Sequence, residues 1–158
     1  MPGIRAGWIV ITGPTDQARD LINGIKLIIN ARLCPNIFGQ MTIPLILPRS
    51  DYLQPLLVPG GRFYDQIEEA YKAINQCDEL SCVKAQAAMY LYIKIKKPIE
   101  NDEKFILKLL ETERVQVVQG TGFDDHNLPR HFRIVCLAPV AELQEGISRL
   151  IRFVQNYR

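Results

Sequence analysis

Apolar residues in the first part of the chain follow the pattern of a buried strand and then that of a helix. Residues 8–11 form a continuous apolar run that the turn sequence Thr12-Gly13-Pro14 closes, which predicts a short strand buried on both faces. From Thr15, a candidate N-cap, apolar residues recur at helical spacing as far as Leu33. We therefore expect one strand and one helix before the break at Cys34-Pro35-Asn36.

The next part of the chain keeps the helical period. A second helix is predicted over residues 37–47, where Pro48 ends it, and the prolines and glycines of residues 55–61 predict a loop. The helix after that loop places its apolar residues on one face, namely Phe63, Ile67, Ala70, Tyr71 and Ile74.

After Asp78 the period of the apolar residues changes to that of strands. Strands are predicted over residues 81–84, 89–95, 115–119 and 132–137. Asn101 is the predicted N-cap of a helix that precedes the third of these strands, and a last helix is predicted to begin at Pro139. Short strands and longer helices in this order favour an α+β fold, a small sheet with helices packed mainly on one face.

Length and charge restrict the class of protein. The 158 residues are enough for one domain with its own core, and a formal net charge of +2 gives no reason to expect nucleic acid or an acidic membrane as a partner. The start of the chain lacks the pattern of a signal peptide, and no apolar run approaches the roughly 20 residues of a membrane helix. We expect a soluble, cytoplasmic protein that binds neither nucleic acid nor membrane.

Cysteine spacing argues against a zinc or redox motif. No two of Cys34, Cys77, Cys82 and Cys136 have the two-residue gap that such motifs use. We interpret the four cysteines as reduced thiols, most of them buried, in a cytosolic protein.

Arg133 is the first candidate for chemistry, because it lies inside a predicted strand on the same face as Val135 and Leu137. An unpaired buried charge costs several kcal/mol, so its guanidinium needs an acidic partner, water at a strand end or an anionic ligand. The fork of the guanidinium matches a carboxylate with two hydrogen bonds. The alternative from periodicity alone is an arginine that leans out of an edge strand.

Three weaker features remain open. Arg5, between Gly3 and Gly7, suits a phosphate or a simple turn. Residues 119–123 contain two glycines after a strand and predict a tight turn or an anion-binding nest. The neighbours Asp124-Asp125-His126 offer metal-ligand chemistry, but adjacent loop residues cannot all face one ion unaided, so no metal site is assigned.

Five segments together are more specific than any one of these features, and they comprise residues 1–8, 32–36, 58–64, 118–123 and 131–137. In order and spacing they resemble the C-terminal part of class I aminotransferases. The resemblance covers essentially the whole chain and is strongest to the alanine aminotransferase-like branch, with tyrosine aminotransferases close behind.

The resemblance implies pyridoxal phosphate as the cofactor and assigns two arginines. Arg5 matches the family arginine that binds the cofactor phosphate, and Arg133 matches the one that binds the α-carboxylate of the substrate. The first lysine of the chain is Lys26, inside a predicted helix. The resemblance implies a Schiff-base lysine farther upstream than the four residues before Arg5, so no catalytic residue is assigned here. By the same resemblance, residues 1–13 are a strand remnant of the large cofactor domain and residues 14–158 the small domain with its interdomain helices.

The functional hypothesis is the substrate-binding portion of an aminotransferase that moves an amino group between an amino acid, alanine-like by preference, and a 2-oxo acid. The family implies a homodimer, and this chain alone is expected to be inactive. The alternative is a free-standing, non-catalytic module of the same fold that binds a carboxylate or a protein partner.

Overall fold

A computed structural model of the chain describes residues 5–34, 36–49, 51, 53–86, 89–123 and 130–157. It divides into two compact units, Met1–Leu53 and Gln54–Arg158, each of which is described by itself. The boundary between the units falls after Leu53. The sequence predicted a different kind of boundary, after residue 13, between a remnant of the large cofactor domain and the small domain. That boundary stays a prediction.

The first unit contains two helices, α1 (Arg19–Ala31) and α2 (Ile37–Ile46). The strand predicted over residues 8–11 is wrong, because residues 5–12 form neither strand nor helix and Trp8 is 61% exposed. A strand exists only where a second backbone pairs with it, and no described residue of this unit supplies one.

The two helices of this unit begin differently, since only α2 has a side-chain cap. The expected N-cap at Thr15 is wrong, since residues 15–18 form turns and α1 begins at Arg19 without a side-chain cap. Asn36 does cap α2, where its Oδ1 accepts a hydrogen bond from the Gly39 amide at 3.1 Å. The second helix ends at Ile46, one residue before the predicted end.

The second unit holds the sheet and the remaining helices. Its elements are α3 (Gln54–Leu57), α4 (Arg62–Asn75), β1 (Leu80–Cys82), β2 (Tyr90–Ile95), α5 (Asp102–Glu113), β3 (Val118–Gln119), β4 (His131–Val135) and α6 (Val140–Asn156). Residues 54–57 form the short helix α3 within the segment predicted as a loop. Asn101 caps α5 as expected, because its side chain accepts a hydrogen bond from the Lys104 amide at 3.0 Å.

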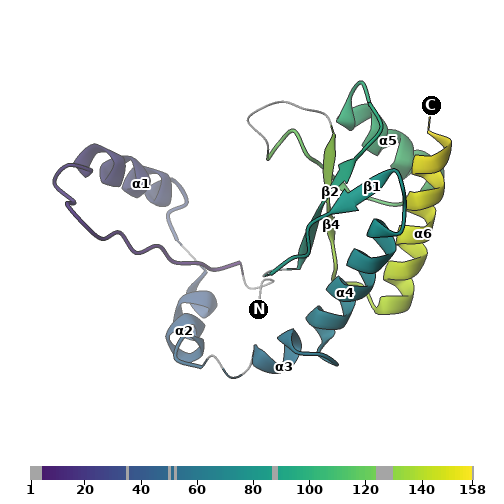
Figure 1. The fold of residues 1–158 in the computed structure, drawn as a ribbon. Helices are drawn as coiled ribbons and strands as arrows, with labels where there is room; N and C mark the ends of the chain where they lie inside the picture. The colour runs from purple at the N-terminus through teal and green to yellow at the C-terminus, as the bar shows by residue number, and fades with distance from the viewer. Residues whose placement is uncertain are drawn as a thin grey trace. The chain divides into compact units, whose positions relative to one another are not determined.

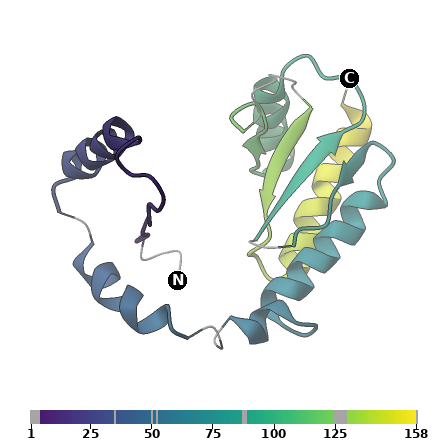
Figure 2. The same cartoon turned by 60° about the vertical axis from the view of Figure 1, so that its left-hand side comes forward.

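The four strands form one antiparallel sheet in the order β1-β2-β4-β3 (Figure 1). The central pairing places Leu91 opposite Ile134 and Ile93 opposite Phe132. These four side chains are buried against α4, α5 and α6, which cover one face of the sheet (Figure 2). The predicted α+β class, with helices mainly on one face, is confirmed.

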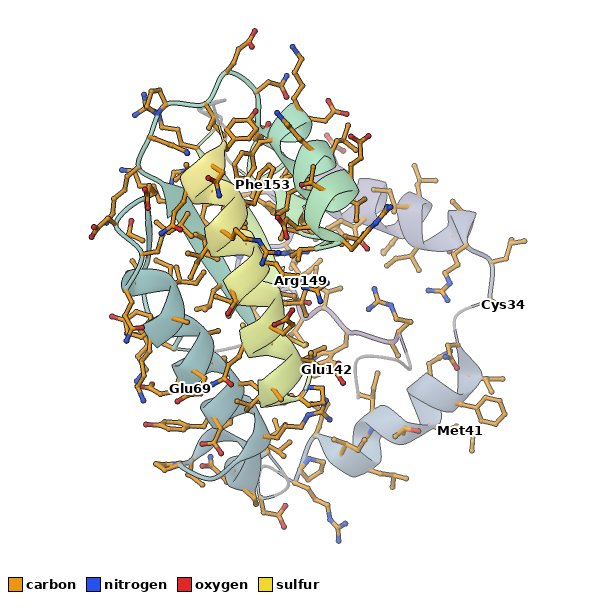
Figure 3. All side chains as sticks on the ribbon, turned by 90° about the vertical axis from the view of Figure 1, so that its right-hand side faces the viewer. Cys34, Met41, Glu69, Glu142, Arg149 and Phe153 are labelled. Carbon is orange, nitrogen blue, oxygen red and sulfur yellow. The ribbon has the colours of Figure 1, made fainter. Side chains whose placement is uncertain are left out.

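The helices close the core from that face. Apolar residues of α6 enter it, including Leu143, Ile147 and Leu150, while Glu142 and Arg149 lie toward the surface (Figure 3). Phe153 packs at 5.2 Å, centroid to centroid, against Phe105 of α5. The face of the sheet that the helices leave uncovered is therefore where a ligand can reach the strands.

Strand ends differ from the prediction where pairing stops. The fourth strand ends at Val135 instead of residue 137, because the chain turns away and the carbonyl of Leu137 accepts hydrogen bonds from Arg62 at 2.7 Å and Gln66 at 3.2 Å. The third strand comprises only Val118–Gln119. Within the predicted segment 115–119, these are the residues that pair with β4.

Candidate functional site

Alternation along β2 and β4 gives the sheet an open face that is aromatic and basic. Along β2 the exposed side chains are Tyr90 and Tyr92, at 36% and 39% exposure, and Lys94, and along β4 the residues of the same face are His131, Arg133 and Val135. Their neighbours in sequence enter the core. The strand register itself therefore gathers these six side chains on one surface.

Arg133 lies in the middle of this face, half-buried and opposite Tyr92 in the register. The alternative of an arginine on an edge strand is wrong, because β4 lies between β2 and β3. The placement beside Val135 is confirmed, whereas Leu137 follows the end of the strand. The guanidinium thus projects from an interior strand away from the core.

Two aromatic rings contact the Arg133 guanidinium. Its Cζ lies 4.5 Å from the ring centroid of Tyr90 and 4.5 Å from that of Phe123. Its Nε is buried without a hydrogen-bond partner, and no ion pair joins it to any residue within the described ranges. A buried donor without a partner costs free energy, which attraction between the cation and the rings offsets in part. The structure therefore provides an arginine with a positive charge that no described carboxylate neutralises.

A second aromatic group borders the arginine. The rings of Tyr92 and His131 stack with a centroid distance of 5.0 Å and an interplanar angle of 4°. Phe123 meets Tyr92 edge-on at 6.4 Å. The hydroxyl of Tyr92 donates a hydrogen bond to the carbonyl of Gly120 at 3.2 Å. This group links β2, β4 and the turn that follows β3.

That turn is held from three directions. A Cβ on Gly120 would lie 2.2 Å from the carbonyl oxygen of His131, so only glycine allows this approach to β4. The amide of Phe123 donates to the Gly120 carbonyl at 2.8 Å. The amide of Thr121 donates to Oδ2 of Asp102 at 2.9 Å, and Asp102 is only 5% exposed. The predicted tight turn is confirmed.

The alternative of an anion-binding nest in residues 119–123 is not supported. The amides of Thr121 and Phe123 are already donors within the protein, to Asp102 and Gly120. The sequence analysis missed the role of Asp102 in holding this turn. An acidic residue in the first turn of a helix is common because it stabilises the helix N-terminus, and it gives no sign of a contact 19 residues away.

Arg5 lies in the other compact unit, so the structure does not place it with Arg133. It is exposed, and its φ of 55° is in the left-handed region. A non-glycine residue with this backbone angle is uncommon and is found mostly in turns. Its exposed guanidinium has the chemistry that a phosphate requires.

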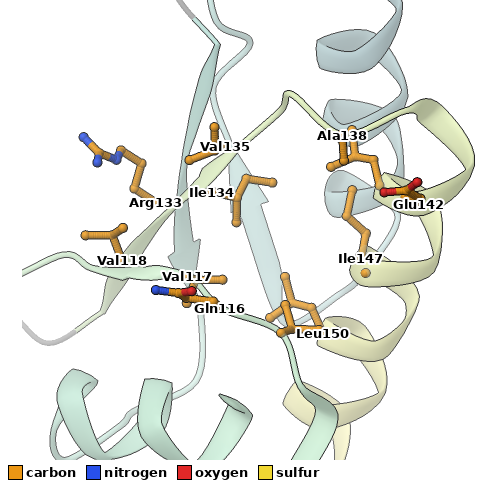
Figure 4. Close-up of a pocket in the computed structure, with 13 residues that line it drawn as sticks. Gln116, Val117, Val118, Arg133, Ile134, Val135, Ala138, Glu142, Ile147 and Leu150 are labelled. Carbon is orange, nitrogen blue, oxygen red and sulfur yellow. The ribbon is translucent and has the colours of Figure 1, made fainter. Parts of the chain in front are cut away.

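An open cavity of about 330 Å³ lies beside this face, at the edge next to β3 (Figure 4). Its walls are mainly apolar and include Ile134, Leu143 and Ile147, with Glu142 at one side. The Arg133 side chain extends away from these residues of α6 and toward the other side of the sheet. Arg133 is among the residues that line the cavity, but its side chain points away from α6, so we take the open face as the candidate site.

The described cysteines and acidic residues provide neither a reactive thiol at Cys136 nor a metal site. Cys77 and Cys136 are buried and Cys82 is half-buried, as expected, but Cys34 is exposed. Burial, with a smaller contribution from Cys82, raises the pKa of Cys136 to about 11, so this thiol is not a nucleophile at neutral pH. Asp124, Asp125 and His126 lie outside the described residues, and the described ones contain no cluster able to hold a metal ion.

Comparisons with known proteins agree on one family. The family model described as aminotransferase class I and II matches residues 1–150. The chain is 40% identical over 159 aligned residues to the glutamate-pyruvate aminotransferase AlaA of Haemophilus influenzae, covering 99% of this chain and 39% of that protein. It is 39% identical to the alanine aminotransferase of Mycobacterium tuberculosis, covering 99% of this chain and 37% of that protein.

A solved structure shows the same fold. The crystal structure of an aminotransferase from Escherichia coli matches with a TM-score of 0.84 and 37% identity, over 98% of this chain and 39% of that one. The chain thus spans about two fifths of the length of the relatives that it matches. None of the helices in the described ranges has the length and apolarity to cross a membrane.

Proposed function

Given that this chain belongs to the aminotransferase class I and II family, we propose that it supplies the substrate-carboxylate site of a pyridoxal-phosphate-dependent aminotransferase. The proposed reaction moves an amino group between an amino acid and a 2-oxo acid. Alanine and 2-oxo acids of similar size are the favoured substrates, because relatives at 39–40% identity are named alanine and glutamate-pyruvate aminotransferases. The expected assembly is a homodimer.

The observation that carries this proposal is the state of Arg133. It projects from the open face of the sheet, opposite the face that α4, α5 and α6 cover, and its charge is not paired within the described residues. Every amino-acid and 2-oxo-acid substrate has a carboxylate, and a guanidinium can hold a carboxylate with two parallel hydrogen bonds. Holding the carboxylate fixes the direction of the Cα bonds, which is the orientation that a group transfer needs.

The proposed cofactor is bound in part by residues outside this chain. Pyridoxal phosphate supplies an electron-withdrawing ring and a carbonyl carbon that accepts the amino group. Of this chain's residues, Arg5 is the one that would hold the phosphate, and its exposed guanidinium fits that task. The Arg133 guanidinium binds the substrate carboxylate, while the rings of Tyr90 and Phe123 keep water from its faces.

A pair of activity assays tests the proposal. The isolated 158-residue chain, with pyridoxal phosphate, alanine and 2-oxoglutarate, should show no turnover above that of the free cofactor, because no lysine stands before Arg5. A hybrid enzyme, in which this chain replaces the matched segment of the H. influenzae relative, should transaminate alanine. Turnover by the isolated chain, or a folded hybrid that binds the cofactor but is inactive, contradicts the proposal.

A further inference from the structure

The contacts around Arg133 assign a role to aromatic residues that themselves have no carboxylate-binding group. A free arginine side chain has about 2 kcal/mol of rotamer entropy, so an arginine on an open sheet face needs something to hold it in one orientation. Neighbours on both sides of β4 contact this one. Tyr90 comes from β2, and Phe123 comes from the turn after β3.

We propose that Tyr90 and Phe123 are positioning residues that clasp the Arg133 guanidinium and present its outer edge to the substrate carboxylate. The inference rests on the proposed function and adds to it the residues that set the geometry of the arginine. A guanidinium is planar, with two faces that stack on aromatic rings and an edge that carries its N–H donors. When rings contact the guanidinium, the donors at its edge stay available to a ligand. Among the guanidinium nitrogens of Arg133, Nε, the one nearest the aliphatic stem, is buried and has no hydrogen-bond partner.

The clasp is itself anchored. Phe123 follows the turn that Gly120 brings close to the His131 backbone, and the buried Asp102 accepts the amide of Thr121. The Tyr92 hydroxyl donates to the Gly120 carbonyl, and the Tyr92 ring meets the edge of Phe123. These contacts fix the Phe123 ring over the arginine although the residue itself is 54% exposed. Phe123 is thus an exposed phenylalanine at the end of a fixed turn, and the cation that it covers is the best explanation of its place.

The alternative is that the rings only stabilise the fold. The two roles differ in what a substitution changes. A structural role lowers the melting temperature and leaves the affinity for carboxylates of the folded enzyme as it was. A positioning role raises KM and the inhibition constant of a simple carboxylate such as acetate, while kcat and the cofactor absorbance stay close to those of the parent.

Phe123→Leu and Tyr90→Leu in the hybrid enzyme separate these roles, with acetate as the inhibitory probe. Loss of one cation–π contact should raise KM for alanine and the acetate inhibition constant together, by about three- to thirtyfold. Phe123→Tyr, which keeps a ring, should recover most of that loss. Tyr64→Leu is the matched control, because it removes a ring that lies 5.6 Å from the ammonium of Lys84, a cation without a role in the site.

The outcomes distinguish this inference from the proposed function. If the parent hybrid is active and both leucine variants keep the parent KM and acetate inhibition, the clasp is wrong and the carboxylate site stands. The clasp is also wrong if Tyr64→Leu raises KM as much as Phe123→Leu. If Arg133→Lys leaves the parent kinetics unchanged, the proposed function fails, and this inference fails with it.

Discussion

At the scale of the single residue, Gly120 shows how a missing side chain positions the site. The chain after β3 approaches β4 so closely that a Cβ at this position would meet the His131 carbonyl oxygen at 2.2 Å and its carbon at 2.6 Å. Both atoms belong to the backbone of an interior strand, so they cannot move aside without disturbing the sheet.

Gly120→Ala should therefore destabilise the chain and displace Phe123 from Arg133. We expect a loss of about 1–3 kcal/mol in the free energy of unfolding, the usual cost of overpacking. Gly122→Ala is the matched control, because a Cβ there meets nothing within 4 Å. Chemical denaturation of both variants measures the effect, and equal stabilities for the two would contradict the close approach.

Single residues also show what the sequence could predict. Arg133 became a candidate because a charged residue interrupts a strand pattern, while its proposed role came from the family resemblance, and Asn101 was predicted as a cap from its position before an apolar period. By contrast, no sequence pattern indicates that Lys97 donates to the carbonyl of Tyr157 at 2.8 Å, beyond the end of α6. Contacts of that kind join residues 60 apart in sequence and leave no periodic signal.

At the scale of the element, helices α5 and α6 are tied together at the surface by Glu113 and Arg152. The Nε of Arg152 donates to Oε1 of Glu113 at 3.3 Å, and its Nη2 donates to Oε2. The hydrogen bond from Arg152 lowers the pKa of Glu113, burial opposes the shift, and the charge of Arg152 adds to it. The folded state therefore favours the ionised carboxylate.

A pH dependence follows from that sign. Because the pKa of Glu113 is lower in the folded state, the pair stabilises the fold above the ordinary value of 4.5, and the stabilisation is lost as the pH falls through the lowered value. Glu113→Gln should slightly lower the melting temperature at neutral pH and leave it unchanged in strong acid. Glu111→Gln, on the same helix, removes an exposed carboxylate that forms no ion pair with a described residue. A deficit for Glu113→Gln that persists in acid would contradict the pair.

Elements were predicted well where their own residues determine them. The apolar face of α4 follows from local periodicity, and so does the alternation of β2, which was predicted to within one residue of its ends. The run at residues 8–11 has an equally clear strand pattern and forms no strand. An apolar run predicts a buried strand only if another strand pairs with it, and the sequence of the run does not determine whether such a strand is present.

At the scale of the whole molecule, the exposed apolar side chains are concentrated in the first unit. No residue of α1 is buried, and its exposed apolar side chains include Leu21, Leu27, Ile28 and Ile29, at 55–76% exposure. Contiguous apolar surface beyond a few hundred Å² usually associates with another surface.

The isolated chain should therefore self-associate at micromolar concentration. Light scattering over a concentration series should show a mass above that of the monomer, and Ile28→Lys should lower it by placing a charge on the exposed face of α1. The expected control is Leu107→Lys, which changes a 51% exposed residue of α5 in the second unit. A strictly monomeric parent chain would contradict the prediction.

The kinetics of Arg133→Lys in the hybrid enzyme test the central claim, that Arg133 holds the substrate carboxylate, most directly. Lysine keeps the positive charge and loses the two-pronged geometry, so one charge-assisted hydrogen bond of about 1.5–3 kcal/mol is lost. We predict a kcat/KM for alanine about ten- to a hundredfold below that of the parent, with cofactor absorbance and melting temperature close to the parent values. An unchanged kcat/KM in a folded, cofactor-loaded enzyme would remove Arg133 from the site.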